Sequence, residues 1–285
     1  MISGRTRVLG VIAHPVAHTS SPAMHNAALA ALGLDYVYVP FHVAPQNLPA
    51  AVAGMRALEV AGLNVTVPHK QAVIPLLDQV SEEARAIGAV NTIAWRDGRL
   101  WGDNTDAYGV LQSLAHDGGL AELPPRVVLL GAGGAARAVL YALLQRPEVE
   151  EVLLLNRTLG RAQILARDLG GGRRVRAAQL GEEAAAQVAR AGLLINATSA
   201  GMHPQEDESP VQDPSCLQPG MVVLDIVYRP LRTRLMAQAQ ARGARAANGL
   251  GMLAYQGARS FEIWTGQCPP VEVMLEAALA QMAGA

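Results

Sequence analysis

The order of apolar and polar residues divides the first third of the chain into alternating strand-like and helix-like segments. Short runs rich in β-branched and aromatic residues predict strands, and stretches of helical periodicity predict helices. The predicted strands are Arg7–Ala13, Tyr36–His42 and Gly62–Val67, and the predicted helices are Pro22–Leu32, Leu48–Leu58 and Gln71–Leu77. This alternation is typical of βαβ units with parallel strands.

A hairpin signal interrupts this alternation. Asp97-Gly98 separates the apolar runs Val90–Trp95 and Arg99–Gly102, and Asp-Gly is a strong signal for a two-residue turn between antiparallel strands. A sheet that contains both this hairpin and the parallel units is mixed. We therefore expect an N-terminal α/β domain built on a mixed sheet.

The second half of the chain has the pattern of a doubly wound domain. After a helix from Asp106 to the break at Asp117-Gly118-Gly119, the stiff junction Leu123-Pro124-Pro125 precedes a new strand. The predicted strands are Val127–Leu130, Val152–Asn156, Leu193–Asn196 and Val222–Asp225, and the predicted helices are Ala135–Gln145 and Arg161–Leu169. This succession predicts a Rossmann-like nucleotide-binding domain. Two apolar helices, Leu250–Trp264 and Val271–Met282, have no strand after them and must pack on one of the two domains.

Composition narrows the function classes. With 285 residues, 51% of them hydrophobic, the chain suits two α/β domains or one large one. A net charge of -1 gives no electrostatic footprint for nucleic acid or an acidic membrane, so we expect a small-molecule partner. The longest apolar stretch, 127–144, contains Arg137 and a glycine cluster, and the N-terminal apolar run is too short for a signal peptide. We expect a soluble, cytoplasmic protein.

Metal binding is not supported by the sequence. Cys216 and Cys268 lie far apart without the spacing of a metal site, and the seven histidines do not form a ligand set. We therefore predict no metal and two free thiols.

The lysine content points to one position. Of the 23 basic residues, 22 are arginine, and the single lysine is Lys70 in Val-Pro-His-Lys70. Arginine serves at solvated sites and in most ion pairs, but it cannot give up a proton near neutral pH. Lys70 is therefore a candidate acid/base or compact ammonium donor, although drift of the composition toward arginine explains its isolation equally well.

A glycine-rich segment lies between a predicted strand and a predicted helix. In Gly131-Ala-Gly-Gly-Ala-Ala136, Gly131 permits a tight turn, Gly133 lets a pyrophosphate approach the backbone, and Ala136 suits the helix-packing position. The alternative is an ordinary strand-to-helix turn, but a second strand of the right kind follows and favours dinucleotide binding. The cofactor-binding residues predicted here are Gly131, Ala132, Gly133, Gly134 and Ala135.

The next strand indicates which dinucleotide is bound. It ends in Asn156-Arg157-Thr158, where an NAD-binding domain usually has an acidic residue for the ribose hydroxyls. Asn156 and Thr158 can hydrogen-bond, while Arg157, together with Arg161, can pair with a 2′-phosphate. NADP is therefore favoured over NAD, the alternative being that Arg157 lies on a solvated turn. Backbone near Thr198, at the end of a later strand, can approach a nicotinamide, although such a stretch is more often an ordinary turn.

Polar residues gather at the strand ends of the N-terminal domain. Taken singly, each is typical of a turn. Taken together they suit a polyol carboxylate, because hydroxyls bind a carboxylate, amides bind ring hydroxyls and a Lys/Asp pair serves proton transfer at a carbonyl. The residues are Thr19, Ser20, Ser21, Asn64, Thr66, Lys70, Asn91 and Asp103-Asn104-Thr105-Asp106.

Motifs over nearly the whole chain resemble those of the shikimate/quinate dehydrogenase family. In order they are Gly10-Val-Ile-Ala-His-Pro-Val-Ala-His18-Thr-Ser-Ser21-Pro22-Ala-Met-His25-Asn26, Asn64-Val-Thr66-Val-Pro-His-Lys70, Gly88-Ala-Val-Asn91-Thr, Gly102-Asp-Asn104-Thr105-Asp106, the Gly131 loop, Asn156-Arg157-Thr158, Asp225-Ile-Val-Tyr228-Arg-Pro230 and Gly249-Leu-Gly251-Met-Leu-Ala-Tyr-Gln256-Gly257. The resemblance implies reversible, NADP-linked reduction of 3-dehydroshikimate to shikimate, a step of aromatic amino-acid biosynthesis. It also implies a discontinuous substrate domain, residues 1–105 plus 250–285, around an NADP-binding domain at 106–249.

The resemblance assigns roles to individual residues. Lys70 and Asp106 correspond to the catalytic pair, and whether Lys70 is the proton donor or mainly an electrostatic clamp stays open. Thr19 and Ser21 would hold the substrate carboxylate. Ring hydroxyls would be held by Asn64, Thr66, Asn91, Asp106 and Gln256, and Tyr228 would lie near the substrate. Ile226 and Gly249 complete the predicted cofactor site, and the protein is expected to be a monomer or a homodimer.

Two departures from the family pattern keep a rival function open. Thr19 stands where serine is commoner, and its methyl group narrows the carboxylate pocket while keeping a hydroxyl donor. His14 replaces a smaller or acidic residue without a clear mechanistic meaning. The rival is an NAD-linked quinate/shikimate dehydrogenase of catabolism, against which Asn156-Arg157-Thr158 argues. A non-catalytic sensor of shikimate-like ligands is a further alternative, but such a protein need not keep Lys70 and Asp106.

Overall fold

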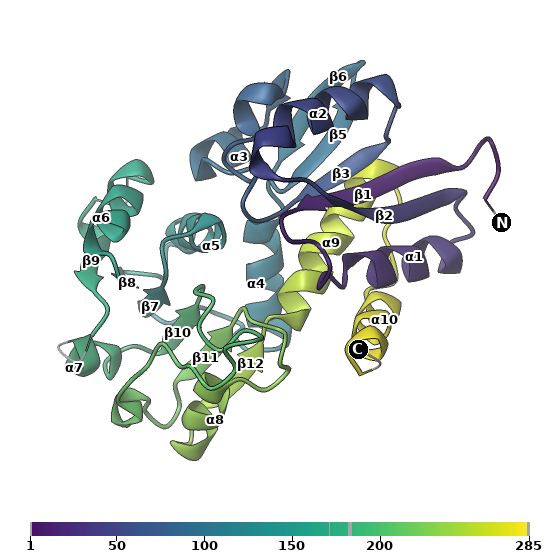
Figure 1. Ribbon diagram of the computed structural model, residues 1–285. Coiled ribbons are helices and arrows are strands. Elements are labelled where there is room, and N and C mark those ends of the chain that lie inside the picture. Colours follow the sequence, from purple (N-terminus) through teal and green to yellow (C-terminus); the bar gives the residue numbers. More distant parts are fainter. Residues whose placement is uncertain (1, 171, 182–183, 284–285) are drawn as a thin grey trace. The chain divides into compact units, whose positions relative to one another are not determined.

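The computed structural model describes residues 2–170, 172–181 and 184–283. The chain forms two compact units, one of Met1–Gly109 with Ala254–Ala285 and the other of Val110–Leu253. The divisions between them fall inside the helices α4 (Asp106–His116) and α9 (Leu250–Thr265). Each unit has its own sheet (Figure 1), and each sheet has six strands, so the α/β class is confirmed.

The sheet of the first unit is mixed, as the hairpin signal predicted. Its order is β2-β1-β3-β5-β6-β4, with β1 parallel to β2 and β3, and β5 antiparallel to β3 and β6. The strands are β1 (Arg7–Ala13), β2 (Tyr36–His42), β3 (Gly62–Val65), β4 (Gln79–Val80), β5 (Thr92–Arg96) and β6 (Arg99–Asp103). Asp97 and Gly98 join β5 to β6 with φ of 49° and 71°, the left-handed conformation that a two-residue hairpin requires.

This topology brings loops that are distant in sequence to one edge of the sheet. The carboxyl ends of the parallel strands β1 and β3 meet there, together with the start of β5 and the end of β6, because β5 runs antiparallel to β3. The backbone N–H of Asn91, which precedes β5, donates to the carbonyl of Asp103 at the end of β6 (3.0 Å). The segments after β1, β3 and β6 are therefore neighbours, and these carry most of the predicted substrate residues.

Helices of the first unit cover its sheet. They are α1 (Ser21–Ala31), α2 (Leu48–Ala57), α3 (Glu82–Ile87), the greater part of α9, and α10 (Val271–Ala283), and a 3₁₀ turn η1 (Pro45–Asn47) leads into α2. α10 packs beside α1 (Figure 1). The Trp264 indole of α9 donates to the carbonyl of Ile93 in β5 (2.9 Å). The C-terminal helices thus complete the N-terminal unit.

The second unit is an all-parallel, doubly wound sheet. Its order is β12-β11-β10-β7-β8-β9, and chain order reverses between β7 and β10, the point at which such sheets bind ligands. The strands are β7 (Arg126–Leu130), β8 (Glu151–Asn156), β9 (Val175–Gln179), β10 (Leu193–Asn196), β11 (Val222–Asp225) and β12 (Arg245–Asn248). The helices are α5 (Gly134–Leu144), α6 (Leu159–Asp168), α7 (Ala185–Val188) and α8 (Arg234–Ala241), with 3₁₀ turns η3 (Gly172–Arg174) and η5 (Pro214–Cys216). The Rossmann-like prediction is confirmed.

One predicted helix is wrong and several elements were missed. The segment Gln71–Leu77 forms turns and the short 3₁₀ helix η2 (Ile74–Leu76) rather than an α-helix, and Pro75 lies at its start. The edge strands β4, β9 and β12 and the helices α3, α7 and α8 had no counterpart in the sequence prediction. Edge strands such as β9 and β12 carry arginine and alanine instead of the β-branched runs that mark central strands.

Candidate active site

Lys70 and Asp106 form an ion pair at the loop edge of the first sheet. Lys70 Nζ lies 2.6 Å from Asp106 Oδ2, and the two side chains are only 14% and 6% exposed. The carbonyl of Lys70 accepts a hydrogen bond from the Val90 backbone (2.8 Å), which fixes the loop after β3. Asp106 is the first residue of α4, and its backbone N–H donates to Asn104 Oδ1 (3.0 Å), so the helix start is held as well. Both partners of the pair are thus positioned by their backbone.

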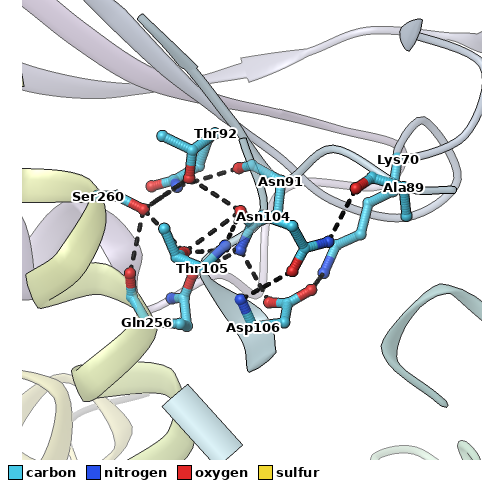
Figure 2. A network of polar contacts seen from close by, with 10 residues as sticks. Lys70, Ala89, Asn91, Thr92, Asn104, Thr105, Asp106, Gln256 and Ser260 are labelled. Atoms are coloured by element: carbon cyan, nitrogen blue, oxygen red, sulfur yellow. Dashed lines mark hydrogen bonds and ion pairs between the residues drawn. The ribbon is translucent and has the colours of Figure 1, made fainter. Parts of the chain in front are cut away.

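Asn91 orients the Asp106 carboxylate from the side opposite Lys70 (Figure 2). Its Nδ2 donates to Asp106 Oδ1 (2.9 Å), to Thr105 Oγ1 (2.9 Å) and to Gln256 Oε1 (3.2 Å). Its Oδ1 accepts from the Thr105 backbone (2.8 Å). Each carboxylate oxygen therefore has its own donor, and the four predicted site residues Lys70, Asn91, Asp106 and Gln256 lie in one network.

Ser260 is a member of this network that the sequence analysis missed. It is fully buried on α9, one helical turn after Gln256, and it donates to the carbonyl of Gln256 (3.1 Å). Its Oγ accepts from Asn64 Nδ2 (3.0 Å) and lies 2.7 Å from Thr92 Oγ1 (Figure 2). The i+4 spacing from Gln256 is the only sequence signal that could have identified it. Ser260 joins the C-terminal helix to the strands that carry the amides.

Asn64 belongs to the same cluster and has a second partner that the sequence analysis missed. Asn64 is 6% exposed at β3, and the Tyr38 hydroxyl of β2 donates to its Oδ1 (2.7 Å). Burial raises the pKa of Tyr38 well above its usual range, and the nearby Ser21 hydroxyl acts in the opposite direction. Tyr38 is therefore a neutral phenol between two predicted substrate residues.

The predicted carboxylate-binding hydroxyls lie together where α1 begins. Thr19 Oγ1 donates to Ser21 Oγ (3.1 Å), and the Ser21 backbone donates to Thr19 Oγ1 (3.3 Å). Ser21 is buried as the first residue of α1, and Pro22 follows in the first turn. Thr66 is half-buried; its backbone N–H donates to Ile12 (3.1 Å) and its carbonyl accepts from His69 (2.8 Å). The first unit thus holds every predicted substrate residue except Tyr228.

The second unit contains the glycine-rich turn. Gly131 has φ of +107°, and a Cβ there would lie 2.8 Å from the carbonyl oxygen of Ala197 in the turn after β10. Gly133 has no atom within 4 Å of a Cβ position, and α5 begins at Gly134 without a side-chain cap or an acidic residue in its first turn. Backbone N–H groups at such a helix start bind anions, so the turn of Gly131, Ala132, Gly133, Gly134 and Ala135 fits a pyrophosphate.

The end of β8 presents exposed cations beside that turn. The β7 and β8 strands are parallel neighbours, so the segments that follow them leave the same edge of the sheet. Arg157, Thr158 and Arg161 are exposed, α6 has no acidic residue in its first turn, and Asn156 Nδ2 donates to the carbonyl of Thr158 (2.8 Å). Two guanidinium groups without a carboxylate in this turn fit the 2′-phosphate of NADP.

Thr198 and Ile226 are held by a buried network at the ends of β10 and β11. Asn196 Oδ1 accepts from the backbone and the hydroxyl of Thr198 (3.0 and 2.7 Å), and Asn196 Nδ2 donates to Asp225 Oδ1 (2.9 Å). Asp225 is fully buried, and burial raises its pKa, against the opposing effect of the Thr233 hydroxyl bonded to it (2.7 Å). The hydrogen bonds of Asn196 and Asp225 therefore fix the turns that carry Thr198 and Ile226.

Gly249 and Tyr228 also belong to the second unit. Gly249 donates its backbone N–H to the carbonyl of Val227 (3.1 Å), which places it beside the segment that contains Ile226. Tyr228 is half-buried, and burial raises the pKa of its phenol, with Arg229 acting in the opposite direction.

In the part of the chain that the structure describes, no group of three or more metal-binding side chains occurs. The described helices also include none long and apolar enough to cross a bilayer.

Comparisons with known proteins agree over the length of the chain. Residues 11–93 match the family described as the shikimate dehydrogenase substrate binding domain, 120–230 match shikimate / quinate 5-dehydrogenase, and 249–279 match the shikimate 5'-dehydrogenase C-terminal domain. A shikimate dehydrogenase (NADP(+)) of Methanopyrus kandleri is 46% identical over 281 residues, covering 98% of this chain and 97% of its own.

Two solved structures are similar throughout. A shikimate dehydrogenase in complex with NADP+ superposes with a TM-score of 0.91 at 40% identity, covering 99% of this chain and 98% of its own. A shikimate 5-dehydrogenase of Thermus thermophilus, in complex with NADP(H) and shikimate, has a TM-score of 0.85 at 40% identity and covers 96% and 99%.

Proposed function

The chain belongs to the shikimate/quinate dehydrogenase family, and we propose that it catalyses the reversible, NADPH-dependent reduction of 3-dehydroshikimate to shikimate in aromatic amino-acid biosynthesis. The resemblance found in the sequence motifs is thereby confirmed. The observation that carries the activity is the Lys70–Asp106 pair, 2.6 Å apart and almost buried, inside a network of amides and hydroxyls.

Lys70 and Asp106 take part in the proton transfer to the carbonyl oxygen of the substrate. When bound, NADPH would supply the hydride that the carbonyl carbon of the substrate accepts. Lys70 presents an ammonium that hydrogen-bonds to the carbonyl oxygen and supplies or stabilises its proton as negative charge develops there. Asp106 holds the ammonium in place and is itself held by Asn91. In the reverse direction the same pair receives the hydroxyl proton.

The remaining polar residues of the first unit bind the substrate. We assign the carboxylate to Thr19 and Ser21, whose hydroxyls are adjacent (3.1 Å), and the ring hydroxyls to Asn64, Thr66, Asn91, Asp106 and Gln256. Support comes from burial and interlocking of most of these side chains, which leaves them little freedom to reorient. Tyr228 of the second unit is proposed to contact the substrate as well.

The second unit is proposed to bind NADP. The Gly131–Ala135 turn takes the pyrophosphate, while Arg157 and Arg161, with Asn156 and Thr158, take the adenosine 2′-phosphate. Thr198, Ile226 and Gly249 are assigned to the nicotinamide end because they follow strands at the carboxyl edge of the sheet. The corresponding domains are residues 1–105 plus 250–285 for the substrate and 106–249 for NADP, in a cytoplasmic monomer or homodimer.

The test is the absorbance of reduced nicotinamide after mixing the purified protein with shikimate or quinate and, separately, with NADP or NAD. We expect fast turnover with shikimate and NADP. Fast turnover with quinate and NAD instead would replace this function by the catabolic one. Folded protein that binds shikimate without turnover of any pair would refute the enzyme assignment.

A further inference from the structure

The amide of Asn64 has its polarity fixed by its neighbours. Nδ2 donates to the carbonyl of Asn91 (3.2 Å) and to Ser260 Oγ (3.0 Å), and Oδ1 accepts from the Tyr38 hydroxyl (2.7 Å). A primary amide has two N–H donors and an oxygen with two lone pairs. Both donors are thus engaged within the protein, and one lone pair of Oδ1 is left. Asn64 can therefore meet a substrate only as a hydrogen-bond acceptor.

Tyr38 holds the oxygen end of this amide. It points inward from β2 at 1% exposure, and a phenol hydroxyl is the only donor that the described contacts give to Asn64 Oδ1. If the amide were reversed, its N–H groups would face the Tyr38 hydroxyl and its oxygen would face the Asn91 carbonyl. The reversed amide would bring two acceptors together at the Asn91 carbonyl, so that carbonyl selects the observed orientation. The Tyr38 hydroxyl, which can donate or accept, then holds Oδ1 in place.

The ring of Tyr38 is held by an unusual buried histidine. The His25 ring stacks on Tyr38 with centroids 4.3 Å apart and planes 11° apart, and it lies nearly parallel to the Phe261 ring on α9 (6.2 Å, 5°). His25 is fully buried, and neither ring nitrogen has a hydrogen-bond partner among the described residues. Burial lowers its pKa to about 3, and nearby Asn64, outside hydrogen-bond geometry, opposes this only in part. The imidazole is therefore neutral near pH 7 and stacks face to face on the Tyr38 ring.

We propose that Tyr38 is a positioning residue for substrate recognition: held by the His25 stack, its hydroxyl holds Asn64 Oδ1 in the position in which that oxygen accepts a hydrogen bond from one ring hydroxyl of the substrate. The inference rests on the proposed shikimate dehydrogenase function. Tyr38 contacts Asn64 and is not part of the proton-transfer pair.

The decisive variant is Tyr38→Phe, which keeps the ring and its stack but removes the hydroxyl. Without that donor Asn64 Oδ1 loses the hydrogen bond that holds it in place, so we expect KM for shikimate to rise about ten- to hundredfold, with a smaller change in kcat. The matched control is Tyr36→Phe, two residues earlier on β2, whose hydroxyl accepts from Arg7 instead (2.6 Å). The control should keep the KM of the wild type.

Substrate analogues separate positioning from general damage. Two shikimate analogues, each lacking one of the non-reacting ring hydroxyls, are compared in wild type and Tyr38→Phe. One of the two analogues lacks the hydroxyl that donates a hydrogen bond to Asn64. We expect KM for that analogue to be the same in both proteins. An equal loss for shikimate and both analogues, or an unchanged KM for shikimate in Tyr38→Phe, would overturn the inference.

Two substitutions of His25 test the same point if Tyr38→Phe folds poorly. His25→Phe keeps the stack and should retain the KM of the wild type, whereas His25→Leu removes the stack and should raise it. Equal KM values in the two variants would contradict the inference. Absence of shikimate turnover in the wild type would refute the proposed function itself, so the two failures are distinguishable.

Discussion

The two units build their proposed sites from different materials. In the first unit, buried side chains bond to one another: Lys70, Asn91 and Asp106 form a chain whose atoms lie 2.6 to 2.9 Å apart. In the second unit, the Gly131 turn offers mainly backbone, and the side chains of Arg157 and Arg161 are exposed. An interlocked site discriminates by shape and hydrogen-bond polarity, while an open turn binds phosphate by charge and backbone N–H groups. Substitutions in the first unit should therefore change the recognition or turnover of the substrate, whereas substitutions in the second unit should lower the affinity for the nucleotide by smaller steps.

The largest effect is expected for Lys70→Arg. Charge is retained, but a bulky guanidinium cannot take the place of the ammonium against Asp106 or donate a proton. We expect kcat to fall by roughly two to four orders of magnitude with a smaller change in KM, measured by steady-state kinetics with shikimate and NADP. Turnover close to that of the wild type would refute the role given to the single lysine.

Arg157→Ala tests the open site through its charge. The exposed guanidinium is assigned to the 2′-phosphate, a group that NAD lacks. We expect the affinity for NADP to fall about ten- to hundredfold, while the affinity for NAD stays nearly constant, as measured by titration of each nucleotide. An equal loss for both nucleotides would place Arg157 outside the 2′-phosphate site.

The two glycines of the turn should respond differently to alanine. Gly131→Ala introduces a side chain at φ of +107° and against the Ala197 carbonyl, so we expect a loss of about 1–3 kcal/mol in the free energy of unfolding. Gly133→Ala has open space and φ of -90°, so stability should be retained while NADP binding weakens. Denaturant unfolding and nucleotide titration separate the two. Unchanged NADP affinity in Gly133→Ala would argue against pyrophosphate at this turn.

The smallest effect near neutral pH is that of the buried histidine, which acts only as the pH falls. Because the pKa of His25 is about 3 in the folded protein and near 6.5 when unfolded, the unfolded chain binds an additional proton between these values. The stabilising contribution of neutral His25 is present above about pH 6.5 and is lost as pH falls toward 3. His25→Phe should flatten this part of the stability curve, measured by urea unfolding at several pH values. Identical slopes in variant and wild type would contradict it.

Central features of the fold could be predicted because their signals are local. β1 and β2 have the predicted bounds, and the Asp97-Gly98 hairpin and the parallel strands of the second unit follow from turn chemistry and buried apolar runs. The helix expected at Gln71–Leu77 failed because helical periodicity was given more weight than the proline within it. Edge strands such as β12 were missed because an edge strand pairs with only one neighbouring strand. Its sequence therefore lacks the buried apolar run that marks a central strand.

The candidate site was only partly accessible to sequence reasoning. Lys70 could be singled out by its isolation among arginines, and Asp106 by its place in a polar cluster, without knowledge of the 2.6 Å contact between them. Ser260 and Tyr38 could not be found in this way, because a serine on an apolar helix and a tyrosine in a strand are ordinary core residues. Their roles depend on which side chains the tertiary structure brings against Asn64.

The isolation of Lys70 has a consequence for covalent chemistry. An amine-selective acylating reagent finds a single side-chain amine in this chain, and that amine is 14% exposed and paired with a carboxylate. Any labelling beyond the α-amino group therefore reports on one atom, Nζ of Lys70. Lysine-directed coupling to a solid support would attach the protein through its proposed reaction centre, whereas coupling through the exposed thiol of Cys268 would leave Lys70 unmodified.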